Sequence, residues 1–149
     1  MNVEALATEL NDLLVSESRS LIHHLDEARP YLTAKTFRIW TEIERLAQMS
    51  QAHARQLSVL LDRLELPERP LSYSPQVANF HYLTLQSLLP QLIREKDLQI
   101  EAYRRSLEHA IEQQTIYVEI EALWQENQLQ LEQLQAIETN LSNSKLVAG

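Results

Sequence analysis

The middle of the chain reads PERPLSYSPQVANFHYLTLQ, residues 67–86, and the predicted topology depends on it. Three prolines, Pro67, Pro70 and Pro75, stand in it among polar turn residues, so it predicts a connection rather than a helix. At roughly 3.3 Å per residue, an extended connection of this length spans about 60 Å. A helix of about 27 residues is roughly 40 Å long at 1.5 Å per residue. The connection can therefore run the full length of a helical bundle.

Four segments with helical periodicity surround this connection, which is expected over residues 66–86. They cover residues 3–29, 33–65, 87–113 and 115–138. The turn at Pro30 and the turn before Thr115 are both short, so consecutive helices at each end form antiparallel pairs. A long connection between two such pairs predicts an all-α four-helix bundle with a crossover in the middle. An up-down-up-down bundle with a flexible loop is the alternative topology.

The helix ends are predicted from residues that cap helices. Thr33 or Thr36 is expected to cap the second helix, and Ser87 the third, with Pro90 still in the first turn where its missing N–H is harmless. Thr115 is expected to cap the fourth helix. The break before Thr115 contains neither glycine nor proline, so a single rod that merges the third and fourth helices stays open.

Composition excludes several classes of function. The chain has 149 residues, no cysteine and a single glycine, Gly149. Without internal glycine there is no GxxxxGK phosphate loop and no GxGxxG dinucleotide turn. Without cysteine there is no disulfide, no thiolate metal site and no cysteine nucleophile. We expect one domain over residues 1–138 and a flexible tail over 139–149.

The net charge of −8 argues against a nucleic-acid surface, which needs a clustered basic face. No positive leader and no apolar run of membrane length is present, so the sequence predicts a cytoplasmic protein without membrane contact. The sequence names no protein partner, and a homodimer is compatible with it.

Polar residues interrupt the apolar stripes of the helices. Glu17 lies between Leu14 and Leu21 on the first stripe, where a carboxylate needs a partner such as Arg104 or a buried water. The polar residues expected inside the bundle, in one hydrogen-bonded network, are Glu17, Ser50, His53, Glu101 and Asn127.

The layout with one crossover resembles the ferritin-like superfamily, which includes ferritins, bacterioferritins and rubrerythrins. Four stretches carry the resemblance: 13–17 (LLVSE), 53–57 (HARQL), 101–104 (EAYR) and 126–129 (ENQL). The resemblance implies a di-iron site built from one Glu on each of two helices and a Glu-x-x-His pair on each of the other two. This sequence contains no Glu-x-x-His.

The family pattern can be placed on the second helix in two ways. Matching the motif gives Ser50 and His53, whereas matching the height along the bundle gives Glu44, with Ala47 where a histidine would stand. On the fourth helix the pair becomes Glu126 and Leu129. In both placements, at least one histidine of the family pattern is replaced by another residue. The candidate metal ligands are therefore Glu17, Glu44, His53, Glu101 and Glu126.

Four buried carboxylates without a metal would repel one another. Either a metal is bound or some of these glutamates face solvent. We predict a bundle that has lost the di-iron site, holds no cofactor, has no assigned catalytic residues and acts as a non-catalytic binding or structural module. The alternative is an iron- or manganese-binding oxidoreductase or metal-storage protein with an irregular carboxylate site. A helical adaptor unrelated to ferritins is the third possibility.

Overall fold

In the computed structural model, residues 3–18, 32–67 and 85–148 are described. They form four helices, α1 (Val3–Ser18), α3 (Ala34–Arg63), α4 (Leu85–His109) and α5 (Gln114–Ala148), and no strand. The expected remainder of the first helix, 19–29, and most of the expected crossover, 68–84, lie outside the described residues. No described helix has an apolar stretch long enough to cross a membrane.

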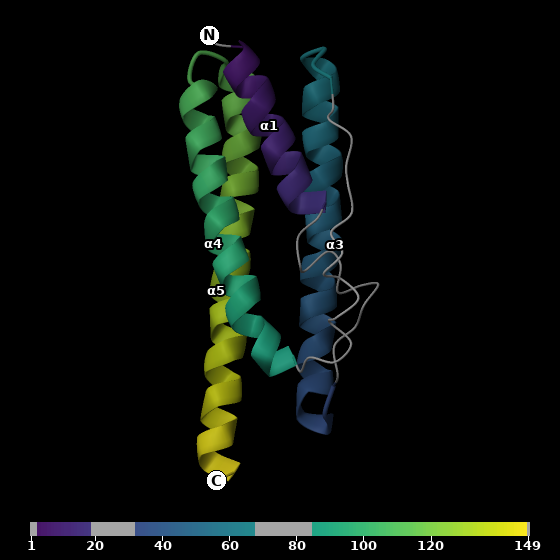
Figure 1. Cartoon of the computed structure of the whole chain (residues 1–149), viewed down its shortest axis with the longest axis vertical. Coiled ribbons are helices and arrows are strands. Elements are labelled where there is room, and N and C mark those ends of the chain that lie inside the picture. The colour runs from purple at the N-terminus through teal and green to yellow at the C-terminus, as the bar shows by residue number, and fades with distance from the viewer. Residues whose placement is uncertain (1–2, 19–31, 68–84, 149) are drawn as a thin grey trace.

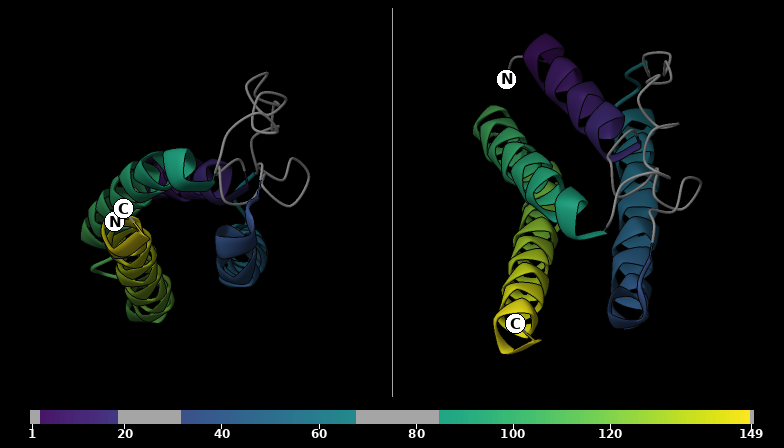
Figure 2. Two further views of the ribbon diagram at one scale, coloured as in Figure 1. Left: turned by 90° about the horizontal axis from the view of Figure 1, so that it is seen from below. Right: turned by 60° about the horizontal axis from the view of Figure 1, so that its bottom comes forward.

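The direction of the helices gives the topology of the bundle. Figure 1 shows α3 and α4 running the same way, while α1 and α5 run the opposite way. Seen along the bundle axis, α1 and α4 lie on one side, and α3 and α5 on the other (Figure 2). Because α3 and α4 run in the same direction, the end of α3 and the start of α4 lie towards opposite ends of the bundle. The predicted all-α bundle of two antiparallel pairs joined by a crossover is confirmed.

Thr33 is the N-cap of α3, as the sequence predicts. Its backbone is extended, its hydroxyl accepts from the Thr36 N–H at 3.3 Å, and the Thr36 hydroxyl accepts from the Thr33 N–H at 2.8 Å. This reciprocal capping box satisfies two backbone donors that have no partner within the helix.

Replacing Thr33 with alanine is expected to lower the free energy of unfolding by about 1 kcal/mol, because the Thr36 N–H then loses its acceptor. Thr41→Ala is the matched control, since Thr41 is exposed within the same helix and alanine has the higher helix propensity. Urea unfolding measures both variants. Equal stability of the two variants would contradict a contribution from the cap.

The start of α4 and the end of α5 differ from the predictions. α4 begins at Leu85 rather than after Ser87, so Pro90 lies one turn inside the helix and not in its first turn. Burial explains this start, because Leu85 and Leu88 are fully buried in the core. α5 continues to Ala148, beyond the expected end at residue 138, and Leu141 packs into the same core.

The third and fourth helices are separate. α4 ends at His109 and α5 begins at Gln114, which excludes the merged rod. The turn is closed by a bond from the Gln113 N–H to the Ala110 carbonyl, and Ala110 is buried. At the end of α3 the chain also turns without glycine, since Glu65 adopts a left-handed backbone with φ of 56°.

The apolar core is divided into two clusters. Trp40, Ile43 and Leu46 of α3 pack with Leu85–Leu92 of α4 and Leu134–Leu141 of α5 in one cluster. α1 belongs to the other cluster, in which its leucines meet Leu57–Leu61, Tyr103–Ala110 and Ile116–Leu123. Between them, on every helix, the buried positions are polar. The side chains of this buried polar layer are Glu17, Ser50, His53, Lys96, Gln99, Asn127 and Gln130.

Candidate functional site: a buried polar layer

Glu17 is the only carboxylate buried within the polar layer among the described residues, with no exposed surface. Its Oε2 accepts from the Ser50 hydroxyl at 2.7 Å. Its Oε1 accepts from the Tyr103 hydroxyl at 2.9 Å and from the Asn127 amide at 3.2 Å. Donors from α3, α4 and α5 therefore converge on one carboxylate of α1, which satisfies a group that would otherwise be costly to bury.

His53 lies between two carboxylates. Its Nδ1 is 3.4 Å from Glu17 Oε1, an ion-pair distance, and its Nε2 is 2.6 Å from Glu126 Oε2. The imidazole is 2% exposed, whereas the Glu126 side chain is 47% exposed. Because each ring nitrogen faces an acceptor, the arrangement favours the doubly protonated ring, with one N–H directed to each carboxylate.

Lys96 places a positive charge inside the bundle. The side chain is 1% exposed, and its ammonium donates to three amide oxygens, Gln99 Oε1 at 2.7 Å, Asn127 Oδ1 at 2.7 Å and Gln130 Oε1 at 2.8 Å. An ammonium has three N–H donors, so these bonds use all of them. Each N–H of the Lys96 ammonium therefore has an acceptor.

Asn127 connects the buried cation to the buried anion. Its Oδ1 accepts from Lys96 while its Nδ2 donates to Glu17 Oε1 and to the Leu123 carbonyl. Gln99 extends the same network to α1, because its Nε2 donates to the Ser16 carbonyl at 3.1 Å. The network therefore joins all four helices through hydrogen bonds, and within the described residues only the Gln130 amide nitrogen and His53 Nδ1 of this layer have no hydrogen-bond partner.

The electrostatics of the layer keep Glu17 ionised. Burial alone would raise the pKa of Glu17, but the contact with His53, the charge of Lys96 and the Ser50 hydrogen bond together lower it to about 2. Burial lowers the pKa of His53, but Glu17 and Glu126 outweigh that effect and raise it above 6.5. Burial lowers the pKa of Lys96 against the opposing charges of Glu17 and Glu95.

The structure brings together three of the five candidate ligands. Glu17, His53 and Glu126 form a row, with His53 in the centre. Of the two placements on α3, the pair Ser50 and His53 lies at the level of Glu17, and Glu44 lies about 9 Å away along the helix, half-buried.

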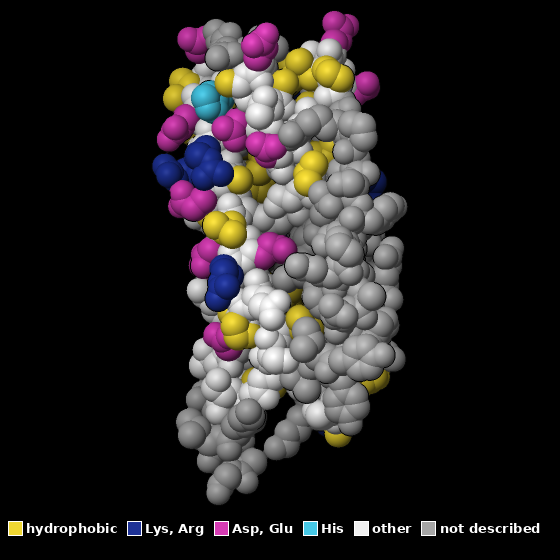
Figure 3. Space-filling model, in the orientation of Figure 1, with side chains coloured by type: hydrophobic (Ala, Val, Ile, Leu, Met, Phe, Trp, Pro, Cys, Tyr) yellow, Lys and Arg dark blue, Asp and Glu magenta, His cyan; other side chains and the backbone are white. Residues whose placement is uncertain are grey.

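The expectation that Glu101 lies inside the bundle is wrong. Its side chain is 53% exposed and binds Arg104 at 3.0 Å, on a face of α4 where basic and acidic side chains are intermixed (Figure 3). Arg104 is therefore not the partner of Glu17 either. The reason is the rotation of α4: Gln99 and Tyr103 point inward, so Glu101, midway between them in sequence, points outward.

The predicted network is otherwise confirmed, since Glu17, Ser50, His53 and Asn127 are all buried and connected. The sequence analysis missed Lys96, Gln99 and Gln130, all of them buried, and took Tyr103 only as an apolar residue. A signal was present: the spacing Leu92, Lys96, Gln99, Tyr103 follows the four-three-four pattern of a buried stripe. A lysine on such a stripe is unusual, because lysine is rarely buried without a partner.

This set of side chains does not fit a di-iron centre. Both oxygens of Glu17 accept from neutral donors, and the two carboxylates in contact with His53 face its two nitrogens rather than a common point. A dication beside Lys96 would also meet a like charge in a low-dielectric interior. Within the described part of the chain, no three His, Cys, Asp or Glu side chains are arranged to hold a metal ion.

The protein is similar in structure to a known protein, although its sequence matches no known family. No family model matches the sequence, and no curated protein matches it either. One solved structure, of ferritin-like, diiron-carboxylate proteins from Bacillus anthracis str. Ames, superposes with a TM-score of 0.78. The match covers 91% of this chain and 96% of that chain at 17% sequence identity. At the level of fold, the protein is therefore a ferritin-like four-helix bundle.

Proposed function

We propose that this protein is a ferritin-like bundle that has lost the di-iron site and serves as a non-catalytic binding or structural module. The observation that carries the proposal is the Lys96 ammonium, fully bonded inside the bundle to Gln99, Asn127 and Gln130. In a metal-binding bundle, the bound ions offset the charge of the buried carboxylates. Here Glu17, the one buried carboxylate among the described residues, already has His53 and Lys96 as counter-charges.

The donors around Glu17 support the same proposal. Ser50, Tyr103 and Asn127 hold its two oxygens with hydrogens, and hydrogen-bonded oxygens would have to exchange these partners to bind a metal. His53 supports the proposal in the same way, because its contacts with Glu17 and Glu126 raise the pKa of its imidazole. Such a layer stabilises one register of the four helices, as buried polar groups do in other bundles.

Metal analysis tests the proposal. Protein purified from culture supplemented with iron and manganese is expected to contain neither metal in stoichiometric amount. Its melting temperature should be unchanged by added Fe²⁺, Mn²⁺ or Zn²⁺. A metal at about a hundredfold its Kd would add about 2.7 kcal/mol, which corresponds to a rise of roughly 5–10 °C for a chain of this size.

The competing function is a metal-binding oxidoreductase or storage protein that uses iron or manganese. The likeness to a diiron-carboxylate structure is what favours it. Stoichiometric metal that disappears in the Glu17→Ala variant would establish that alternative and overturn the proposal. The Glu44→Ala variant is the matched control, because Glu44 lies away from the row formed by Glu17, His53 and Glu126.

A further inference from the structure

Lys96 and Asn127 meet inside the polar layer, and between them they hold an amine and a carboxamide, from which an amide bond can form. Lys96 Nζ is 2.7 Å from Asn127 Oδ1. Because Oδ1 is about 1.2 Å from Cγ, the nitrogen lies within about 4 Å of that carbon. Attack on a carbonyl carbon starts at roughly 3–3.5 Å. A small shift of the lysine side chain therefore brings its nitrogen to the reacting distance.

Burial makes the neutral amine of Lys96 accessible and directs its lone pair. Lys96 is 1% exposed, and burial lowers its pKa, which raises the fraction of the nucleophilic free amine. When the ammonium gives up one proton, the oxygens of Gln99 and Gln130 still accept its two remaining hydrogens. The lone pair is then on the side of Nζ that faces Asn127.

Glu17 is placed to transfer a proton between the two nitrogens. Its Oε1 accepts from Asn127 Nδ2 at 3.2 Å. Once Lys96 Nζ is bonded to Cγ, both nitrogens are attached to the same carbon, so the carboxylate lies near both. A positioned carboxylate that moves a proton in this way typically accelerates a reaction by about 10²–10⁴.

Asn127 is a better acyl group than the two glutamines that also contact Lys96. The amide nitrogen of Gln99 donates to the Ser16 carbonyl, which does not carry protons as a carboxylate does. The amide nitrogen of Gln130 is buried and has no hydrogen-bond partner among the described residues. Because Gln130 Oε1 is 2.8 Å from Nζ, the same amide group offers a spare donor close to the charge that develops on Asn127 Oδ1.

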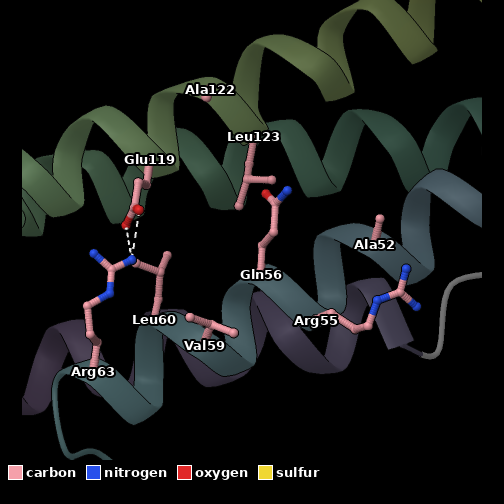
Figure 4. A pocket seen from close by; sticks show the side chains of 9 residues that line it. All are labelled: Ala52, Arg55, Gln56, Val59, Leu60, Arg63, Glu119, Ala122 and Leu123. Atoms are coloured by element: carbon pink, nitrogen blue, oxygen red, sulfur yellow. Dashed lines mark hydrogen bonds and ion pairs between the residues drawn. The ribbon is translucent and has the colours of Figure 1, made fainter.

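The surroundings of Lys96 favour a partner within the chain over a dissolved substrate. Figure 4 shows the groove between α3 and α5, which has a volume of about 600 Å³, and neither Lys96 nor Asn127 lines it. Asn127 has no exposed surface. A site closed to water also protects the reaction from hydrolysis.

We propose that Lys96 and Asn127 form an intramolecular amide cross-link between α4 and α5. The lone pair of Nζ forms the new bond to Cγ, and the Cγ–Nδ2 bond breaks with its electron pair on Nδ2. Glu17 takes one proton from Nζ and passes it to Nδ2, so ammonia leaves. The proton that the ammonium lost at the start ends on the released ammonia, and no oxidant or other reactant is consumed.

The cross-link forms slowly and once per molecule, because three oxygens around Nζ favour the ammonium over the free amine. The charged layer is therefore the reactant, and freshly purified protein retains it. The inference goes beyond the proposed function, because it gives the bundle a covalent bond between two helices that hydrogen bonds otherwise join.

Intact-mass spectrometry of the full chain tests the proposal without any substitution. Fresh protein is expected to show mainly the mass of the sequence, and incubation of the folded protein at mildly alkaline pH should lower that mass by one ammonia. Peptide mapping of the product should find the segment around Lys96 joined to the segment around Asn127. A mass that stays unchanged for several days would overturn the proposal, as would a cross-link to either glutamine.

Variants distinguish the cross-link from ring closure of an asparagine onto its own backbone, which also releases ammonia. Lys96→Met, kept folded below its melting temperature, is expected to retain its full mass because the nucleophile is absent. Asn11→Ala is the matched control, since Asn11 is a buried asparagine that donates to two backbone carbonyls, and its loss of ammonia should equal that of the wild type. Continued loss of ammonia in Lys96→Met would contradict the cross-link.

Glu17→Gln tests the proton transfer. The variant keeps the shape of the side chain and is expected to lose ammonia at least about tenfold more slowly than the wild type. An unchanged rate would remove Glu17 from the reaction. The metal measurements are independent of these experiments, so a metal-free protein that keeps its full mass would reject the cross-link and leave the proposed function standing.

Discussion

Replacing Lys96 with methionine is expected to lower the free energy of unfolding by about 3–5 kcal/mol, the typical cost of removing one partner from a buried charge pair. Methionine fills a similar volume, so the loss is electrostatic rather than a cavity. The variant removes the charge of Lys96 from the buried Glu17, which keeps only the contact with His53, and it leaves the amide oxygens of Gln99, Asn127 and Gln130 without their donor. Urea unfolding at neutral pH measures the change.

A shift of this size corresponds to a fall in melting temperature of roughly 6–20 °C. Arg105→Met is the matched control, because Arg105 is an exposed cation on the same helix. Its effect should stay within about 0.5 kcal/mol, as for most surface substitutions. If both variants lost the same stability, the buried ammonium would contribute nothing specific.

The double variant Lys96→Met with Glu17→Gln separates charge balance from packing. It removes both buried charges while keeping the volumes, and the glutamine side chain that replaces Glu17 retains an oxygen that can accept from Ser50 or Tyr103. We expect the double variant to recover at least half of the stability that Lys96→Met loses, since neutral replacements of buried ion pairs are often tolerated. Additive losses would contradict electrostatic coupling between the two residues.

The stability of the protein is expected to fall steeply in acid, with Glu17 as a large single contributor. The pKa of Glu17 is lowered from 4.5 to about 2 in the folded state. The folded carboxyl therefore binds protons more weakly than the unfolded one, and its contribution is fully present above pH 4.5. That contribution is lost as the pH falls from 4.5 towards 2. At about 1.4 kcal/mol per pKa unit, it amounts to about 3–4 kcal/mol.

Urea unfolding at a series of pH values between neutrality and acid measures this dependence. The double variant without charges at positions 17 and 96 is the reference, because it retains the other carboxyl groups and lacks the one under test. The wild-type curve should fall towards the reference curve between pH 4.5 and 2. Two curves that stay parallel through this interval would show that Glu17 is not held ionised by its surroundings.

Much of the fold could be predicted from local physical chemistry. Thr33 caps α3 because a threonine hydroxyl accepts a backbone N–H wherever a helix begins. The turn between α4 and α5 was harder, since residues 110–113 contain neither glycine nor proline, yet the break falls there. The polar residues Ser50, His53 and Asn127 were correctly expected inside, because each interrupts an apolar stripe of its own helix.

The errors arose from rotation of a helix about its axis. α4 buries one face, which includes Lys96, Gln99 and Tyr103, and Glu101 lies on the opposite, charged face. A rotation by about two residues would exchange Glu101 for Gln99 inside the bundle. Composition alone favours a buried glutamate no more than a buried lysine, because both are rarely buried without partners.

Periodicity and chain length were enough to predict the four helices of the described residues, their polar interruptions and a long connection between two antiparallel pairs. What balances the charge of Glu17 could be seen only once the helices were packed together. Whether a carboxylate meets a metal, an arginine or a lysine depends on which side chains of other helices reach the same point. That point is defined by packing between residues such as Glu17 and Asn127, which are more than a hundred positions apart and whose interaction no local pattern encodes.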